Sequence, residues 1–313
     1  MKIVKVLKGL AWWVVLIAVL AFSLCFALPS FFKKEQATDY KTVVTIWNVD
    51  TFEGGKGSRT AFLNAVAKEV EKEESVIFMV LSKTLEGAQM ALENGEMPDL
   101  LSFGPGIRIA ASNKVYCWCM GKYALFTKRK ESGRNAEPNS KNTVLSLGGK
   151  NLPTIAAALS GFSGDLRREN SLEAYVRFLN GDFAYLLGTQ RDAQRLISRG
   201  VEVDATSLND FTDLKQYITA LKVENKKLGQ VFIDCLLSER IQRKLTTIGM
   251  FSENYSIYGA DEPLCRALEE GKIKYSLSYN EWLTDFAELS ASAERVLAGV
   301  ENVDFLRKIL KST

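Results

Sequence analysis

The chain has 313 residues, of which 47% are hydrophobic and 25% charged, and it contains no histidine. This globular composition is long enough for one large domain or two lobes, and it excludes a disordered chain, a collagen-like repeat and a small disulfide scaffold. The missing histidine excludes Ser–His–Asp and Cys–His nucleophile systems, HExxH metal sites and imidazole acid–base catalysis. We therefore expect a binding protein and no enzyme, catalytic residue, metal site or cofactor.

The net charge of +3 arises at the N-terminus, where residues 1–34 carry five lysines and no acidic residue. The other 279 residues hold 35 basic and 37 acidic side chains, so the charge gives no sign of a nucleic-acid surface. Lys2, Lys5 and Lys8 precede an uncharged stretch over residues 9–32, the pattern of an export signal. We assign residues 1–34 as a signal or membrane-anchor segment and expect the body on the extracytoplasmic face of the cell membrane.

Three outcomes for this segment stay open. The stretch exceeds the about 7–15 apolar residues of a cleaved signal and is roughly long enough to span a bilayer, which favours a retained anchor before Lys33. Cleavage after Ala27 is compatible with the small residues Cys25 and Ala27. Lipidation of Cys25 is disfavoured by Leu24 before it. A buried core helix is the least favoured interpretation.

The body contains four cysteines, an even number that permits disulfides in an exported protein. Cys117 and Cys119 lie two apart in a strand-like run, so we expect both side chains to face the same way. Cys235 and Cys265 fit the apolar faces of helices, and we expect them in the core.

Residues 42–103 alternate between strand and helix patterns. Short apolar runs at residues 42–47, 76–81 and 99–103 predict strands. Helices are predicted between them, one after the cap Ser58 with its apolar face ending at Val70, the other from Leu85 to Leu92. A β-α-β-α-β order with short loops predicts the α/β class and a parallel, doubly wound sheet.

The rest of the chain continues this plan with more helix. Strands are predicted over residues 115–127 and 183–187, the first crossing to a second lobe and the second ending in the turn 188–191. Helices are predicted near 151–159, 172–179, 211–221, 228–235, 261–271, 281–289 and 293–310. We expect residues 35–125 to form the first part of lobe 1 and residues 126–208 a reduced lobe 2. Residues 209–313 then form a helical return to lobe 1 and the C-terminal helices.

Open α/β sheets bind ligands beyond the carboxyl ends of their strands. The loops there combine aromatic and polar side chains: Trp47, Asn48, Asp50, Phe52, Glu53, Phe103, Gln190 and Arg191. Aromatic faces beside planar hydrogen-bonding groups suit a polar ligand such as a sugar. The glycine-rich run 53–57 could instead cradle an anion or form a plain turn. A hydrolytic pair of Asp50 and Glu53 is disfavoured, and Trp282 is either a core residue or a ligand platform.

Five segments carry a resemblance to a known family. They are VTIWNVD, ALENGEMPDLLSFG, KYALFTKRK, YVRFLNGDFAYLLGT and FIDCLLSERIQRKLTTIGMFSEN. In order, they resemble the extracellular solute-binding proteins of ATP-binding-cassette importers, of the sugar-binding type, over most of residues 42–260. The resemblance implies a two-lobed periplasmic-binding-protein fold of type II, in which each lobe is a doubly wound sheet flanked by helices.

The resemblance also implies a ligand site between the lobes. Carried over by position, its residues are Trp47, Asn48, Asp50, Phe52, Glu53, Phe103, Gly104, Thr189, Gln190, Arg191 and Ser252. We expect a monomer that captures a small polar solute, with a sugar or oligosaccharide favoured, and delivers it to permease subunits. The short second lobe keeps an alternative open, a non-transport sensor or scaffold module on the same fold.

Overall fold

The computed structural model describes most of the chain. The described residues are 12–13, 15–20, 22, 41–49, 57–104, 107, 109–110, 112–133, 136–147, 152–164, 166–208, 213–259 and 286–311. The chain divides into two compact units, Met1–Thr42 and Val43–Thr313. In the first unit Trp12, Trp13, residues 15–20 and Phe22 are helical and exposed. Among the described residues, no helix has the length and apolar character that a bilayer crossing requires.

The second unit is built on one mixed sheet. Its described strands are β1 Thr42–Val49, β2 Val76–Lys83, β3 Leu100–Phe103, β4 Val115–Lys128, β5 Thr143–Leu147, β6 Arg167–Asn170, β7 Tyr185–Thr189, β8 Val203–Ser207 and β9 Asp213–Ala220. They follow the order β2-β1-β3-β9-β4-β7-β5-β6, with β8 beside β4. β1 is parallel to β3, and β5 is parallel to β6 and β7. β9 and β4 are antiparallel to their neighbours. The α/β class is confirmed, and the expected parallel pairing occurs away from the middle of the sheet.

Strand β4 is shared by two halves of the sheet. Its first part pairs with β9, from Val115 opposite Thr219 to Lys122 opposite Asp213. Its last part pairs with β7 and β8. We call β2, β1, β3, β9 and residues 115–122 the first half, and β7, β5, β6, β8 and residues 123–128 the second half. The chain therefore passes between the halves along β4 and returns along β8 and β9.

Both halves have the same strand order. Three strands that follow one another in the sequence are arranged second, first, third in space, as β2-β1-β3 and as β6-β5-β7. The third strand of each set then pairs with an antiparallel neighbour, β9 or β4. Each half therefore has a switch point where the strand order reverses, between β1 and β3 and between β5 and β7. Such switch points are where open α/β sheets bind ligands.

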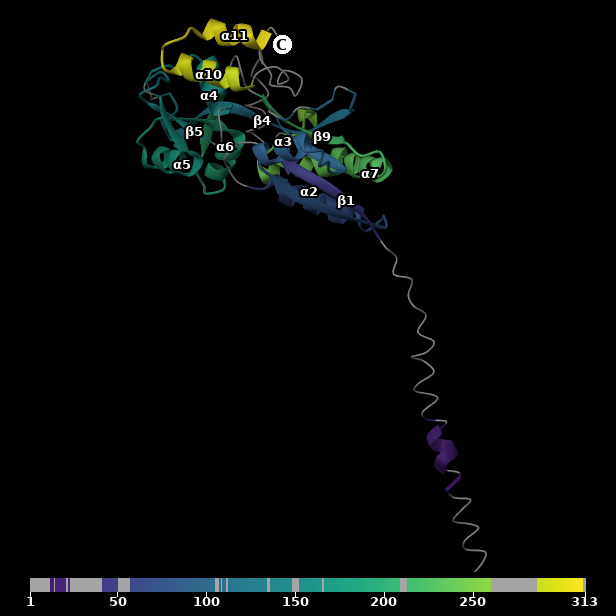
Figure 1. Cartoon of the computed structure of the whole chain (residues 1–313). Coiled ribbons are helices and arrows are strands. Elements are labelled where there is room, and N and C mark those ends of the chain that lie inside the picture. The colour runs from purple at the N-terminus through teal and green to yellow at the C-terminus, as the bar shows by residue number, and fades with distance from the viewer. Residues whose placement is uncertain are drawn as a thin grey trace, which may run out of the picture. The chain divides into compact units, whose positions relative to one another are not determined.

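Helices cover both faces of each half. On the first half, α2 Arg59–Val70, α7 Lys226–Leu237 and α8 Glu239–Gln242 share a core with one face, and α3 Leu85–Glu93 covers the other. On the second half, α4 Leu152–Leu159, α10 Phe286–Leu297 and α11 Val303–Lys311 pack together on one face. α5 Ser171–Asn180 and α6 Gln190–Ile197 cover the opposite face. Figure 1 shows α10 and α11 beside α4, so these C-terminal helices belong to the second half.

Three short 3₁₀ helices complete the described elements, η1 Arg129–Glu131, η2 Arg243–Ile248 and η3 Tyr255–Ile257. Two helix predictions are wrong. The helix expected over 211–221 is strand β9, because pairing with β3 on one side and β4 on the other outweighs the helical spacing of Leu214 and Ile218. The helix expected over 293–310 is divided between α10 and α11, where Gly299 adopts a φ of 72°.

The expectation that Cys117 and Cys119 face the same way is also wrong. The register of β4 against β9 shifts between these two residues, which marks a β-bulge at Trp118. Cys117 packs on the α3 face, whereas Trp118 and Cys119 both lie in the core under α2 and α7. A bulge turns a side chain out of the strict alternation of a strand, and here it buries the Trp118 indole. Among the described cysteines, Cys117, Cys119 and Cys235 are not disulfide-bonded.

Candidate functional site

The first switch point holds a buried network of uncharged polar groups. Asn48, near the end of β1, is fully buried, and its Oδ1 accepts a hydrogen bond from Ser102 Oγ of β3 at 3.0 Å. Asn48 Nδ2 donates to Thr60 Oγ1 of α2 at 2.9 Å. Ser102 Oγ also accepts from Trp118 Nε1 at 3.2 Å and from Gln216 Nε2 at 3.3 Å. The network therefore joins β1, β3, β4 and β9 to the start of α2.

A buried positive charge lies beside this network. Arg59 is the first residue of α2 and is 3% exposed, and its Nη1 donates to Gln216 Oε1 at 3.4 Å. The helix begins there because the Ser58 side chain accepts the backbone N–H of Ala61. The guanidinium therefore adds hydrogen-bond donors for polar oxygen atoms to the first switch point.

The second switch point is the start of α6. Thr189 and Asp192 form a capping box, in which the Asp192 carboxylate accepts the Thr189 N–H at 3.0 Å. Ser146 Oγ of β5 donates to the same carboxylate at 3.2 Å. Burial raises the pKa of Asp192, against the opposing effect of these hydrogen bonds. This carboxylate caps α6 and connects it to β5, so it is committed to structure.

Gln190 attaches α6 to the middle of β4. Its Oε1 accepts the Lys122 N–H at 2.6 Å, and its Nε2 donates to the Met120 carbonyl at 3.3 Å. Gly121 makes this approach possible, because a Cβ at that position would lie 2.7 Å from Gln190 Nε2. The amide of Gln190 is thereby held at the point where β4 passes from one half to the other.

Arg191 connects the two switch points. Its Nη2 donates to the carbonyl oxygen of Gly57, which precedes α2, at 2.5 Å. Asn48 reaches the same segment through Thr60. Residues 57–60 therefore lie between the first switch point and the Arg191 side chain of the second. Asn48, Thr189, Gln190 and Arg191, all named from the sequence, are gathered around this junction, which we call the switch-point junction.

Other predicted site residues lie elsewhere. Trp47 is buried in the core on the α3 face, with Lys83 Nζ 4.7 Å from its ring centroid. Phe103 is fully buried in the same core, and its ring lies 5.8 Å from that of Tyr217. Adjacent residues of a strand point to opposite faces, so Trp47 points away from Asn48. Gly104 is buried directly after β3.

Ser252 lies in the segment after η2. Its backbone N–H donates to the Tyr258 hydroxyl at 2.8 Å, and its Oγ accepts the N–H of Asn254 at 3.3 Å. It therefore orders its own loop. Asp50, Phe52, Glu53 and Trp282 lie outside the described residues, as do Cys25, Cys265 and the helix expected over 261–271.

Sequence reasoning missed four members of the junction, Arg59, Thr60, Ser102 and Gln216. Ser102 carried a signal, because it is the one polar side chain in the buried run Leu100–Phe103. Gln216 could not be found, since the segment around it was predicted as helix. The position of Trp118 depends on the bulge in β4.

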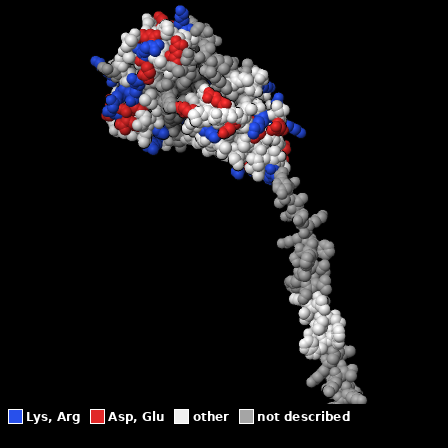
Figure 2. All heavy atoms as spheres, in the orientation of Figure 1, with Lys and Arg blue, Asp and Glu red and all other residues white. Residues whose placement is uncertain are grey.

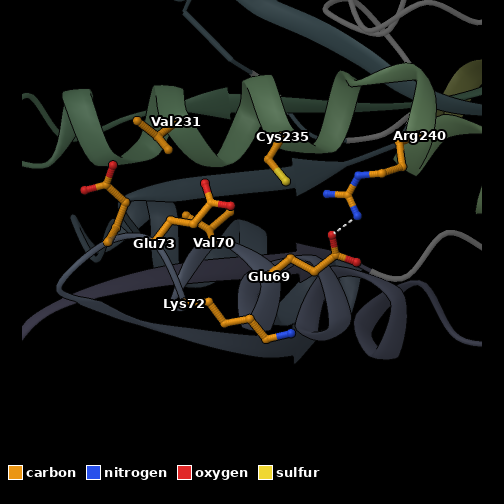
Figure 3. A pocket seen from close by; sticks show the side chains of 8 residues that line it. Glu69, Val70, Lys72, Glu73, Val231, Cys235 and Arg240 are labelled. Carbon is orange, nitrogen blue, oxygen red and sulfur yellow. Dashed lines mark ion pairs between the residues drawn. The ribbon is translucent and has the colours of Figure 1, made fainter.

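A separate groove of about 530 Å³ lies between the end of α2 and α7 (Figure 3). Glu69 at one end pairs with Arg240 and with Lys244, and the hydrogen bond from Lys244 is the main cause that lowers the Glu69 pKa. Burial raises the pKa of the Cys235 thiol, which faces the groove. A thiol held in its neutral form is a poor nucleophile, and burial disfavours the Cys235 thiolate.

The surface and the remaining side chains add little that is specialised. Figure 2 shows basic and acidic side chains interspersed over the described residues of the visible face. Within the described residues, no cluster of three His, Cys, Asp or Glu side chains could hold a metal ion.

No protein-family model matches the chain, and no curated protein matches it.

Proposed function

We propose that this chain is the extracytoplasmic solute-binding component of an ATP-binding-cassette importer. One observation carries the proposal: the two halves repeat the same strand order, and their switch points meet at the start of α2. A ligand held there would contact both halves. Neither half alone provides such a site.

The proposed fold is the two-lobed type II arrangement, with each half of the sheet forming the centre of one lobe. β4 and the β8–β9 return would serve as the hinge, since they are the strands that pass between the halves. Ligand binding favours the closed state when both lobes contact the ligand only in that state. Closure of the hinge would then retain the solute until the protein docks on a permease.

The chemistry of the junction favours a polar solute with oxygen atoms that accept hydrogen bonds. Asn48 and Gln190 bring amide groups, Thr189 a hydroxyl, and Arg59 and Arg191 charged donors. Amides, hydroxyls and guanidinium groups are the side chains that pair with the hydroxyl groups of a sugar. A sugar or oligosaccharide is therefore the favoured solute class. The basic and apolar N-terminal segment would tether the body to the outer face of the membrane.

A melting-temperature screen of the full chain in detergent tests this proposal. The panel contains sugars, oligosaccharides, peptides, polyamines and inorganic anions. A ligand present at one hundred times its Kd stabilises the folded state by about 2.7 kcal/mol, which is roughly 5–10 °C for a domain of this size. We expect such a shift with a sugar. No shift with any member of the panel would contradict solute binding and favour the sensor or scaffold alternative.

The variant Asn48→Ala tests whether the solute binds at the junction. We expect it to raise the Kd for the identified solute at least about tenfold, because a buried site that loses one hydrogen-bonding amide loses about 1.4 kcal/mol or more. Asn64→Ala is the matched control. Asn64 lies further along α2, and its Nδ2 donates to the backbone carbonyl oxygen of Thr60. Equal Kd values for the two variants, measured by calorimetry on folded protein, would remove Asn48 from the site.

A further inference from the structure

The Arg191 side chain is enclosed by backbone of the first half. Arg191 belongs to α6 of the second half, and its Nη2 bonds the carbonyl of Gly57, 134 residues earlier in the sequence. Its aliphatic part lies against Gly249, which ends η2. Ile248 of η2 packs in the core of the first half. One side chain of the second half therefore contacts two separate segments of the first.

Glycine is required at both of these contacts. Gly249 has a φ of 66°, and a Cβ there would lie 3.1 Å from Arg191 Cγ and 3.2 Å from its Cα. Gly57 has a φ of 93°, and its Cβ would lie 2.7 Å from the Cα of Ile248. Both residues adopt the left-handed conformation that glycine tolerates best. The two glycines let the α2 start, η2 and Arg191 pack with no side chain between them.

This contact closes the junction over the polar groups assigned to the solute. Asn48 and Gln190 are fully buried, and Thr189 is 2% exposed. Because these three side chains are buried, segments packed around them must move apart before a solute reaches them. The strands β4 and β8–β9 connect the halves through the main chain. The contact of Arg191 with Gly57 and Gly249 is non-covalent, so it can break while these strands stay connected.

We propose that Arg191 is a latch that holds the two halves together at the switch-point junction. The latch opens when its guanidinium leaves the Gly57 carbonyl, and it closes when Arg191 returns between Gly57 and Gly249. Its role in admitting a solute rests on the proposed function. Its role in holding the halves together does not.

Hydrogen–deuterium exchange of the full chain tests the latch without any ligand. In Arg191→Ala we expect amide exchange at least about tenfold faster over residues 57–63 and 245–250, because opening exposes their hydrogen bonds to water. Arg195→Ala is the matched control. It removes a cation from the same helix, and Arg195 bonds the Ser171 carbonyl within the second half. Equal exchange in these segments for Arg191→Ala and the wild type would overturn the latch.

A pair of glycine variants separates the latch from general loss of stability. Gly249→Ala places a methyl group against Arg191, whereas Gly200→Ala places one at a φ of 78° with no atom within 4 Å. Both variants carry similar backbone strain, and only the first touches the latch. We expect faster exchange over residues 57–63 in Gly249→Ala alone. The same rate in both variants would contradict the proposal.

These outcomes are distinguishable from those of the solute screen. Faster exchange in Arg191→Ala together with no thermal shift would support the latch and contradict transport. A thermal shift with unchanged exchange would support solute binding and overturn the latch. If both proposals hold, Gly249→Ala should also accelerate solute association in stopped-flow fluorescence, compared with Gly200→Ala.

Discussion

Each half of the sheet contains a buried carboxylate, and the two have opposite electrostatic environments. Asp99, in the first half, precedes β3 and is 5% exposed. It accepts the N–H and the hydroxyl of Thr45, both at 2.7 Å, and Asn225 Nδ2 at 2.8 Å. Asp192, in the second half, is 3% exposed and accepts longer bonds, from the Thr189 N–H at 3.0 Å and Ser146 Oγ at 3.2 Å.

The difference shows how the hydrogen-bond donors around a buried carboxylate oppose the effect of burial on its pKa. Burial acts to raise the pKa of Asp99, but the hydrogen bonds from Thr45 and Asn225 outweigh it and hold the pKa below its ordinary value. At Asp192 burial outweighs the hydrogen bonds, and the pKa is raised. Asp99 therefore favours folding in its charged form and Asp192 in its neutral form, and the two predict opposite pH dependence.

The largest effect is expected for Asp99→Asn. The amide replaces one accepting oxygen with a donor, so buried donors on Thr45 or Asn225 lose their partner. We expect a loss of about 2–4 kcal/mol in the free energy of unfolding, measured by urea denaturation at pH 7. Asp234→Asn on the exposed side of α7 should change it by less than about 0.5 kcal/mol. Equal losses for both variants would contradict the role of the donors.

The pH dependence of Asp99→Asn gives an independent check. Because the folded pKa is lowered, the stabilisation from Asp99 is fully present above the unfolded value of about 3.9. It is lost as the pH falls through the folded pKa. The acid limb of the wild-type stability curve, below about pH 4, should therefore be less steep in Asp99→Asn.

For Asp192→Asn we expect a smaller loss of stability and a pH dependence opposite to that of Asp99→Asn. Because the folded pKa is raised, the folded state keeps its proton to a higher pH than the unfolded chain, and stability falls as the pH rises from about 3.9 to the folded pKa. Asp192→Asn should lack this fall, and it should cost less than about 1 kcal/mol because the amide oxygen still accepts the Thr189 N–H. Asp192→Ala, which loses the cap, should cost about 1–2 kcal/mol.

Urea denaturation of the wild type and Asp192→Asn between pH 4 and pH 7 measures this prediction. As the pH rises, the unfolding free energy of the wild type should fall relative to that of Asp192→Asn. A constant difference over that range would mean that Asp192 is charged in the folded protein throughout.

The smallest effect is expected for an exposed ion pair. Arg168 of β6 bonds Glu294 of α10, with side chains 40% and 44% exposed. Pairs in water contribute about 0–1 kcal/mol, so Arg168→Ala should lower the unfolding free energy by no more than that. A loss as large as that of Asp99→Asn would mean that exposure does not distinguish the contributions of charged groups here.

Local patterns in the sequence determined the elements that depend on local contacts. The strands and helices over residues 42–103 follow from the spacing of their apolar residues and from the caps Ser58 and Thr84. α4, α5 and α7 were predicted for the same reason. The strand patterns also predicted that Asn48 and the turn at Thr189–Arg191 lie at strand ends, and the structure has them at the two switch points.

Only the tertiary structure decided the rest, because the deciding contacts join residues far apart in the chain. β9 is a strand because β3 and β4 pair with it. Trp47 and Phe103 face the α3 core because strand alternation places them opposite Asn48 and Ser102. The contact of Arg191 with Gly57 spans 134 residues, a separation at which local patterns carry no information about proximity. The sequence thus determined which side chains stand at the strand ends, and folding decided which of them meet.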